Sequence, residues 1–284
     1  MYLNTTYCII ELSTTIKGDD LINIKLELPS LINEAATPVV RSAGNTIASI
    51  WDIVFGGIDA FSEKQKYRRK LNLQKFKDSL TEKVEDIPIE DIQEPSLSII
   101  GPTLEKSKYY FEEETLRELF ANLVASSINK TKAELVHPAY PDIIQNLSPN
   151  DAEFLKEISD LELIPFCTLR FQKRSNDNQT TFFSYFGEGI TLSRCILKYT
   201  YPENPLYDFN PTIDNLSRLK LIEVTDKCLV DESNYSSFLD NSIYKHFQSE
   251  LFNDSKIMEQ EVTMIKGLIE ITNFGKNFIK TCVI

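Results

Sequence analysis

Residues 112–130 read EEETLRELFANLVASSINK, the clearest helical pattern in the chain. The apolar residues of this stretch recur at spacings of three and four positions: Leu116, Leu119, Phe120, Leu123, Val124 and Ile128. This spacing places them on one face of an amphipathic helix. Glu112–Glu114 stand at its start, where the helix dipole favours negative charge. The stretch therefore predicts a helix that packs against others in a helical domain.

The region before this stretch continues the helical pattern. Thr37-Pro38 has the form of an N-cap followed by a proline at the first helical position, and apolar residues then recur every three or four positions. Gly56-Gly57 weakens that helix. Glu63–Val84 keeps a helical face despite its many bases, and Ile100-Gly101-Pro102 begins another helix. Residues 30–145 are therefore expected to form a helical domain.

The second half of the chain mixes helices with strands. Ser148-Pro149 begins a short helix with an N-cap and a proline, as Thr37-Pro38 does. Strands are expected at Phe166–Phe171, Thr181–Phe186, Leu221–Thr225 and Gly267–Ile271, and helices at Ile213–Leu221 and Thr272–Cys282. The order helix, helix, strand, turn, strand is that of a winged helix-turn-helix. Residues 146–284 are expected to form a winged-helix-like α/β domain with a polar, acidic insertion around 226–261.

Residues 1–29 are expected to form a β-hairpin-like segment. Ile22, Ile24, Leu26 and Leu28 alternate with polar residues, which is the period-two pattern of a strand. A turn-like Lys17-Gly18-Asp19-Asp20 precedes them. The expected fold class is therefore α+β and predominantly α, with an N-terminal β-hairpin and helical bundle followed by a winged-helix-like domain with insertions.

Bulk composition limits the classes of function. The chain has 284 residues and a formal net charge of −12 at pH 7, so binding to nucleic acid would need a concentrated basic face. Its five cysteines are scattered without a C-x-x-C pair, which favours reduced thiols over a disulfide framework or a zinc site. The sequence shows neither a basic-then-apolar leader nor an apolar run of about 18 residues. We expect a cytoplasmic protein.

The sequence contains no evident catalytic constellation. His137 stands before a proline and His246 in the predicted insertion, and neither has a second ligand at metal-binding spacing. The usual phosphate-loop and nucleophile-elbow motifs are absent. Glu112–Glu114, or Asp151 with Glu153, could hold Mg²⁺ for a nuclease, but helix starts that face solvent explain these acids more simply. We therefore predict no catalytic, cofactor-binding or metal-binding residues, and no cofactor.

One apolar helix face and the bases beside it suggest a membrane surface as an alternative partner. The face within residues 47–61 consists of Ile47, Ile50, Trp51, Val54, Phe55 and Ile58. The basic patch that follows consists of Lys64, Lys66, Arg68, Arg69 and Lys70. An amphipathic helix with an aromatic residue and nearby cations is typical of interfacial membrane binding. The competing interpretation is that the face packs inside the bundle, with the bases solvated or paired with Glu85–Glu94.

Two groups of short motifs carry a resemblance to a known family. Between residues 38 and 156 they are Ile50-Trp51-Asp52, Phe55-Gly56-Gly57-Ile58-Asp59, Glu63–Arg69, Glu94–Pro102, Leu119–Leu123, Ser126-Ser127, Val136-His137-Pro138 and Leu147-Ser148-Pro149. Near the end they are Asn215-Leu216, Arg218-Leu219, Leu221-Ile222 and Phe274-Gly275-Lys276. Together they make the chain similar to the abortive-infection alpha family of bacterial proteins. The resemblance implies a role in phage defence and brings no established active site or cofactor.

We therefore expect a non-enzymatic anti-phage protein that acts as an effector or sensor through protein–protein interaction. The expected partner is a phage or host protein, and self-association is a second option. The winged-helix interpretation makes Arg218 and Lys220 the contact residues, and because only two bases stand there beside Asp214, a protein partner is favoured over DNA. The first alternative is an effector that disturbs the inner membrane with helix 47–61 on activation. The second is a metal-dependent nuclease.

Overall fold

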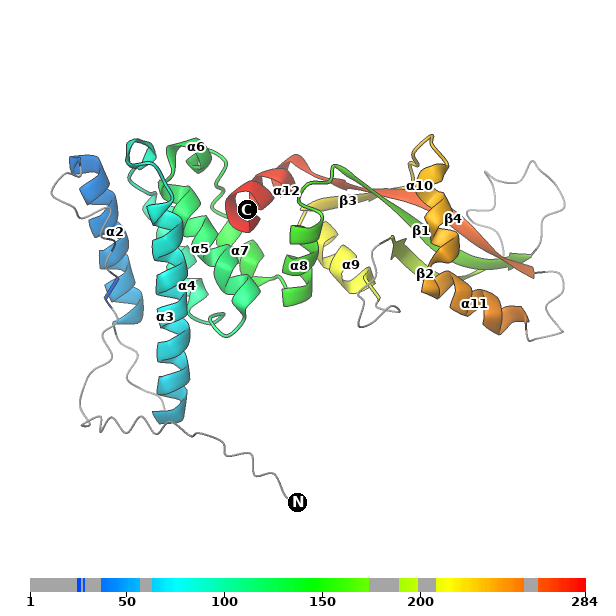
Figure 1. Cartoon of the computed structure of the whole chain (residues 1–284), viewed down its shortest axis with the longest axis horizontal. Helices are drawn as coiled ribbons and strands as arrows, with labels where there is room; N and C mark the ends of the chain where they lie inside the picture. The colour runs from blue at the N-terminus through cyan, green and yellow to red at the C-terminus, as the bar shows by residue number, and fades with distance from the viewer. Residues whose placement is uncertain are drawn as a thin grey trace, which may run out of the picture.

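The computed structural model describes residues 25, 26, 28, 37–56, 63–173, 189–198, 208–252 and 260–284. The molecule is elongated, with a helical half at one end and a four-stranded antiparallel sheet at the other (Figure 1). Helix predominates over strand, as expected for a predominantly α member of the α+β class.

The helical half consists of helices, and side-chain caps mark the starts of α2, α6 and α8. They are α2 (Pro38–Phe55), α3 (Glu63–Glu85), α4 (Leu97–Ser107), α5 (Glu114–Ile128), α6 (Lys130–Ala133), α7 (Tyr140–Gln145) and α8 (Pro149–Glu157), with a 3₁₀ turn η1 (Ile89–Asp91) before α4. The Thr37 hydroxyl accepts the Val40 N–H at 3.4 Å. At α8, Ser148 and Asp151 each accept the other's backbone N–H in a capping box. Caps of this kind contribute about 1 kcal/mol each, so both predicted helix starts are confirmed.

Helix α5 lies at the centre of the helical half. It packs against α3, α4, α7 and α8, and its predicted apolar face is buried throughout, from Leu116 to Ile128. It starts at Glu114 rather than at Glu112, and Glu113 is its N-cap residue. Only one of the three glutamates therefore lies in the first turn.

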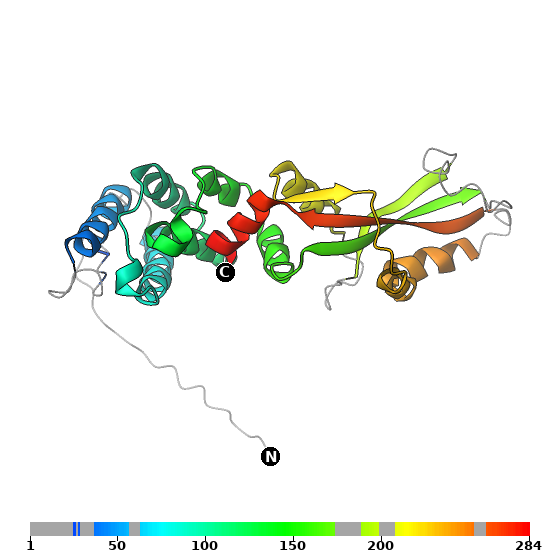
Figure 2. The same ribbon diagram turned by 90° about the horizontal axis from the view of Figure 1, so that it is seen from above.

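The sheet has the strand order β2-β1-β4-β3, and all neighbouring strands are antiparallel. The strands are β1 (Leu163–Lys173), β2 (Gly189–Leu197), β3 (Ile222–Thr225) and β4 (Gln260–Ile271). Helix α9 (Asn210–Arg218) lies on one face of the sheet. Helix α10 (Ser233–Ser236), the 3₁₀ turn η3 (Ser237–Asp240) and helix α11 (Ser242–Phe252) cover the other face (Figure 2).

The last residues of the chain return from the sheet to the helical half. Thr272 caps α12 (Asn273–Phe278), which continues as a π-helical turn, η4 (Ile279–Val283). Asn122 of α5 donates to the Cys282 carbonyl at 2.8 Å, and Ser126 donates to the Thr281 carbonyl at 2.8 Å. These side chains satisfy carbonyls that a helix end leaves without partners. The C-terminal segment is thus part of the core of the helical half.

Several expectations for the second half differ from the structure. A winged helix is not confirmed: α9, β3 and β4 do follow in that order, but β4 pairs with β1 along its whole length in a four-stranded sheet. β4 begins at Gln260, well before the expected Gly267. The expected insertion around 226–261 contains α10, η3, α11 and the start of β4. Burial of apolar side chains against the sheet explains these helices, since Tyr235 and Phe238 are both buried.

Two expected elements lie outside the described residues. One is the strand at Thr181–Phe186, and the described strand that pairs with β1 in this region is β2. The other is the hairpin at residues 1–29, of which only Lys25, Leu26 and Leu28 are described. Both leucines are buried and Lys25 is exposed, in keeping with the expected alternation.

Gly275 allows α12 to approach β3 closely, and this contact gives a test of the fold. A Cβ atom at Gly275 would lie 2.0 Å from the Leu221 carbonyl oxygen, a backbone atom that cannot move aside. We expect Gly275→Ala to lower the free energy of unfolding by about 1–3 kcal/mol, measured by urea denaturation. Gly101→Ala is the control, because a Cβ there meets nothing within 4 Å. Equal stability of the Gly275→Ala protein and the wild type would refute this close contact.

Candidate functional site

A cleft of about 440 Å³ lies between α9 and the adjoining face of the sheet, and we call it the α9 cleft. Helix α9 contributes one stripe of residues at helical spacing: Asn210, Ile213, Asp214 and Ser217. The sheet contributes residues of β1, β2 and β4, together with Val224 and Asp226 at the end of β3. Cavities of about 300–1,000 Å³ are the usual size of binding pockets.

The sheet side of the cleft is lined by apolar and polar residues, and a glycine shapes it. On β1, Phe166, Thr168 and Arg170 share the face that lines the cleft, as the period of two in a strand requires. Phe166 pairs with Gly267 of β4. A Cβ at Gly267 would lie 2.2 Å from the Phe166 ring, so only glycine leaves room for that ring to lie against β4.

A β-bulge on β2 sets the other wall. The pairing of β1 with β2 shifts register twice, between Cys167 and Leu169 and between Leu169 and Arg170. At this bulge Cys195 has a positive φ of 39°, which costs a non-glycine residue on the order of 1–3 kcal/mol. Bulges re-aim side chains and are common beside functional sites. Here both Arg194 and Cys195 line the cleft.

The cleft carries charges of both signs. Arg170, Arg194 and Lys266 line it from β1, β2 and β4, and Asp214 and Asp226 line it from α9 and the end of β3. Burial raises the pKa of the Cys195 thiol to about 11, Asp214 adds to the rise, and Arg194 opposes it. These effects place the three groups near one another. At neutral pH Cys195 is therefore a protonated thiol and not a nucleophilic thiolate.

The apolar face that sequence analysis singled out lies mostly inside the protein. Ile47, Trp51 and Phe55 are buried in the helical core. The Trp51 ring stacks on Phe76 at 5.7 Å between centroids. Ile50 and Val54 are half-buried against the same core. Ile58 lies outside the described residues, and α2 ends at Phe55, with Gly56 as its C-cap.

The predicted basic patch lies on α3. Lys64 and Lys66 fall in the first turns of the helix, where side chains are not described. Arg68 and Lys70 are exposed, and Arg69 is half-buried. The Arg68 guanidinium lies 4.0 Å from the Glu112 carboxylate, and both side chains are more than half exposed. Such a pair contributes little to stability.

The remaining candidates lie apart from one another. Arg218 is the last residue of α9 and Lys220 lies two residues beyond it; both are exposed and outside the cleft lining. The Arg218 guanidinium donates to the Asn215 side-chain oxygen at 2.7 Å. His137 accepts the Ala139 N–H at 3.1 Å through Nδ1. His246 is exposed on α11.

The acidic candidates have structural partners. Besides capping α8, Asp151 accepts a hydrogen bond from the Asn215 amide at 2.8 Å. Glu114 lies 3.9 Å from the Arg117 guanidinium. In the part of the chain that the structure describes, no three His, Cys, Asp or Glu side chains come together in a way that could hold a metal ion. Within the same ranges, every helix is too short or too polar to cross a bilayer.

The α9 cleft itself was not expected from the sequence. Its wall residues Arg170, Arg194 and Cys195 come from two strands, and β2 was not predicted at all. The stripe Asn210, Ile213, Asp214 and Ser217 is visible as helical spacing, but nothing in its composition distinguishes it from a helix face in solvent.

The raised pKa of Cys195 predicts slow and pH-dependent alkylation. With a pKa of about 11, its iodoacetamide rate should rise about tenfold per pH unit from pH 7.5 to 10, since only the thiolate reacts. Exposed Cys228 should be modified first at pH 7.5, and urea should bring Cys195 to the rate of an ordinary thiol. Peptide mapping by mass spectrometry separates the sites. Equal native rates at pH 7.5 would show that Cys195 is not shielded.

Comparisons with known proteins point to one family. The family model described as abortive infection alpha matches residues 68–282, which is most of the chain. No curated protein and no solved structure matches significantly. The matched range includes α3 from Arg68 onward, α4–α9, the whole sheet, the α9 cleft and most of the C-terminal segment that packs on α5. The chain therefore belongs to the abortive infection alpha family, and this membership indicates a role in abortive-infection defence.

Proposed function

We propose that this protein is a non-enzymatic effector or sensor of abortive infection that acts by binding a protein partner, and that the α9 cleft is the contact site. One observation carries the proposal: the cleft is lined both by apolar residues, Phe166, Ile213 and Ile265 among them, and by charged residues of both signs. Specific protein-binding sites combine an apolar centre with a polar rim in this way. The expected partner is a phage or host protein.

The charges of the cleft favour a protein over a nucleic acid as its ligand. Asp214 and Asp226 line the cleft together with three bases, Arg170, Arg194 and Lys266, and a polyanionic phosphate backbone would meet repulsion from both acids. A peptide segment that carries charges of both signs can match groups of both kinds. The chain's net charge of −12 acts against nucleic acid in the same direction.

A protein is also favoured over a nucleic acid in the winged-helix interpretation of α9, β3 and β4. In that interpretation α9 is the contact helix, with Arg218 and Lys220 as its bases. Two exposed bases offer few phosphate contacts, and Arg218 is already hydrogen-bonded to Asn215. We infer a protein partner for this surface also.

A non-enzymatic role is supported by the structural contacts that the candidate polar groups already make. Asp151 caps α8 and holds Asn215, and His137 holds a backbone N–H at a turn. Cys195 is protonated at neutral pH because burial raises its pKa. Each group is accounted for by a structural role, which weighs against the nuclease alternative.

Cleft variants test the proposal in cells. Arg194 and Asp214 are both exposed, so Arg194→Ala and Asp214→Ala should keep the fold. We expect each to reduce protection against a phage that the wild-type protein blocks, measured as plating efficiency. Loss of one charged contact residue should weaken binding by about tenfold.

Matched control variants distinguish loss of a contact in the cleft from a general effect of removing surface charge on protection. Lys156→Ala and Glu153→Ala change exposed charges on α8 and should leave protection intact. A photo-crosslinker at Ser217 should join the protein to its partner during infection, and Arg194→Ala should reduce that product. Full protection by both cleft variants, at wild-type melting temperature, would rule out the cleft as the contact site.

The membrane effector is the second candidate function. The structure indicates how much free energy the release of α2 from the core would cost. The peripheral membrane location that it implies requires α2 to leave the core and expose Val40, Ile47, Trp51 and Phe55, all now buried. At about 1.5–3 kcal/mol per side chain, this costs on the order of 6–12 kcal/mol, comparable with the whole stability of a domain. The observation in its favour is that Val39 and Ile53 are exposed on the outer side of α2.

The single tryptophan reports directly on that release. Trp51 is the only tryptophan in the chain and is fully buried. We expect its fluorescence emission to stay unchanged when vesicles of anionic phosphatidylglycerol are added, because α2 remains in the core. Quenching by brominated lipid would instead place Trp51 in the bilayer and promote the membrane candidate.

A further inference from the structure

The charges along α3 and the segment that follows it are divided into two blocks of opposite sign. Residues 63–77 contain seven bases and one acid, and residues 78–94 contain seven acids and one base. This order opposes the helix dipole, which favours acids at the N-terminal end and bases at the C-terminal end. Asp78 and Glu82, four residues apart, also repel each other. The order therefore does not serve the stability of an isolated α3.

An exposed stripe runs through both blocks on the side of α3 that faces away from the core. It consists of Arg68, Leu71, Lys75, Asp78, Glu82 and Glu85. The spacings alternate three and four, as at the contact positions of a two-helix coiled coil. The opposite side of α3 is buried through Leu73, Phe76, Leu80 and Val84. α3 is thus anchored to the core on one side and presents a regular charged seam on the other.

The outer ends of the two blocks cannot neutralise each other within one helix. Arg68 and Glu85 are 17 positions apart in one helix, which is roughly 26 Å at about 1.5 Å per residue. That distance is well beyond the screening length of about 8 Å at physiological salt. The pair of Arg68 with Glu112, at 4.0 Å between exposed side chains, is too loose to hold the guanidinium away from another acid.

We propose that the exposed stripe of α3 pairs antiparallel with the same stripe of a second copy of this chain. With the two-fold axis beside residues 76 and 77, Arg68 lies opposite Glu85 of the other copy and Lys75 opposite its Asp78. Leu71 packs on the methylene stem of Glu82. Because the axis is two-fold, each of these contacts occurs twice in the dimer. A parallel pairing would bring like charges together, so the charge pattern specifies the antiparallel register.

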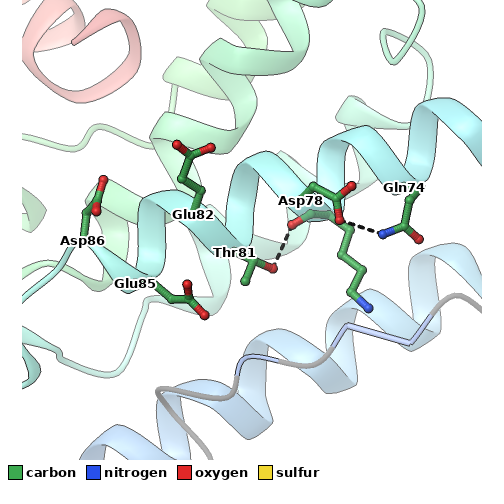
Figure 3. A pocket seen from close by; sticks show the side chains of 7 residues that line it. Gln74, Asp78, Thr81, Glu82, Glu85 and Asp86 are labelled. Atoms are coloured by element: carbon green, nitrogen blue, oxygen red, sulfur yellow. Dashed lines mark hydrogen bonds between the residues drawn. The ribbon is translucent and has the colours of Figure 1, made fainter.

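The acidic block has the shape that this pairing needs. A shallow hollow of about 450 Å³ runs along it, lined by Asp78, Glu82 and Glu85 among others. Figure 3 shows the carboxylates of Glu82, Glu85 and Asp86 projecting from α3, with Asp78 tied to Gln74. The Gln74 amide donates to the Asp78 carboxylate at 2.6 Å, which restricts its orientation. The hollow gives the long arginine and lysine side chains of the second copy room to reach the acids.

Charge-reversal variants test the dimer. Variant A is Arg68→Glu with Lys75→Glu, and variant B is Asp78→Lys with Glu85→Lys. Each should be monomeric alone, because each stripe then repels its own copy, and an equimolar mixture should form an A–B dimer. Sedimentation velocity measures the masses. For the wild type, raising the salt from about 50 mM to about 500 mM should weaken dimerisation by roughly tenfold or more, because exposed ion pairs are screened.

The control changes the same number of charges elsewhere. Glu153→Lys with Glu157→Lys alters two exposed acids on α8 and should dimerise like the wild type. Variants A and B should keep the wild-type melting temperature, which excludes misfolding as the cause of dissociation. A monomeric wild type at low salt would overturn the proposal, as would variants that stay dimeric or a mixture that stays monomeric. Because the stripe is separate from the α9 cleft, none of these results depends on the proposed partner binding.

Discussion

Burial of α5 is the constraint on which the rest of the helical half depends. Its buried face continues around most of the helix, and even Ser126, Ser127 and Arg117 are buried. A helix of this kind is stable only when neighbours cover it on all sides. Four of these neighbours precede or follow it closely in the chain, and the last one is the C-terminal turn η4. The hydrogen bonds from Asn122 and Ser126 fix the position of that turn.

The position of the sheet follows from the same arrangement. β4 leads directly into α12, and Thr272 accepts the Gly275 N–H while it donates to the Lys220 carbonyl. One residue therefore fixes both the start of α12 and the end of α9. Since α9 forms one wall of the cleft, the shape of the candidate site depends on contacts that begin in the helical core. The bulge at Cys195 then adjusts the opposite wall locally.

The sequence predicted the elements that local rules determine. Thr37-Pro38 and Ser148-Pro149 marked helix starts because a cap and a proline act within one turn, and the stripe from Leu116 to Ile128 marked α5. The helices after Asp226 were missed because their few apolar residues are separated by polar ones and gain burial only against the finished sheet. The cleft was missed for a related reason, since its charged residues come from five separate segments that tertiary contacts alone bring together.

The return of η4 to α5 also has a consequence for synthesis of the protein. Asn122 and its hydrogen-bond partner Cys282 are 160 positions apart in the chain. At about 5–20 residues per second, the ribosome adds this length in roughly 8–32 s. During that time the surface of α5 that later contacts η4 has no native partner. The helical half, although first to leave the ribosome, must therefore wait for the last residues before its core can close.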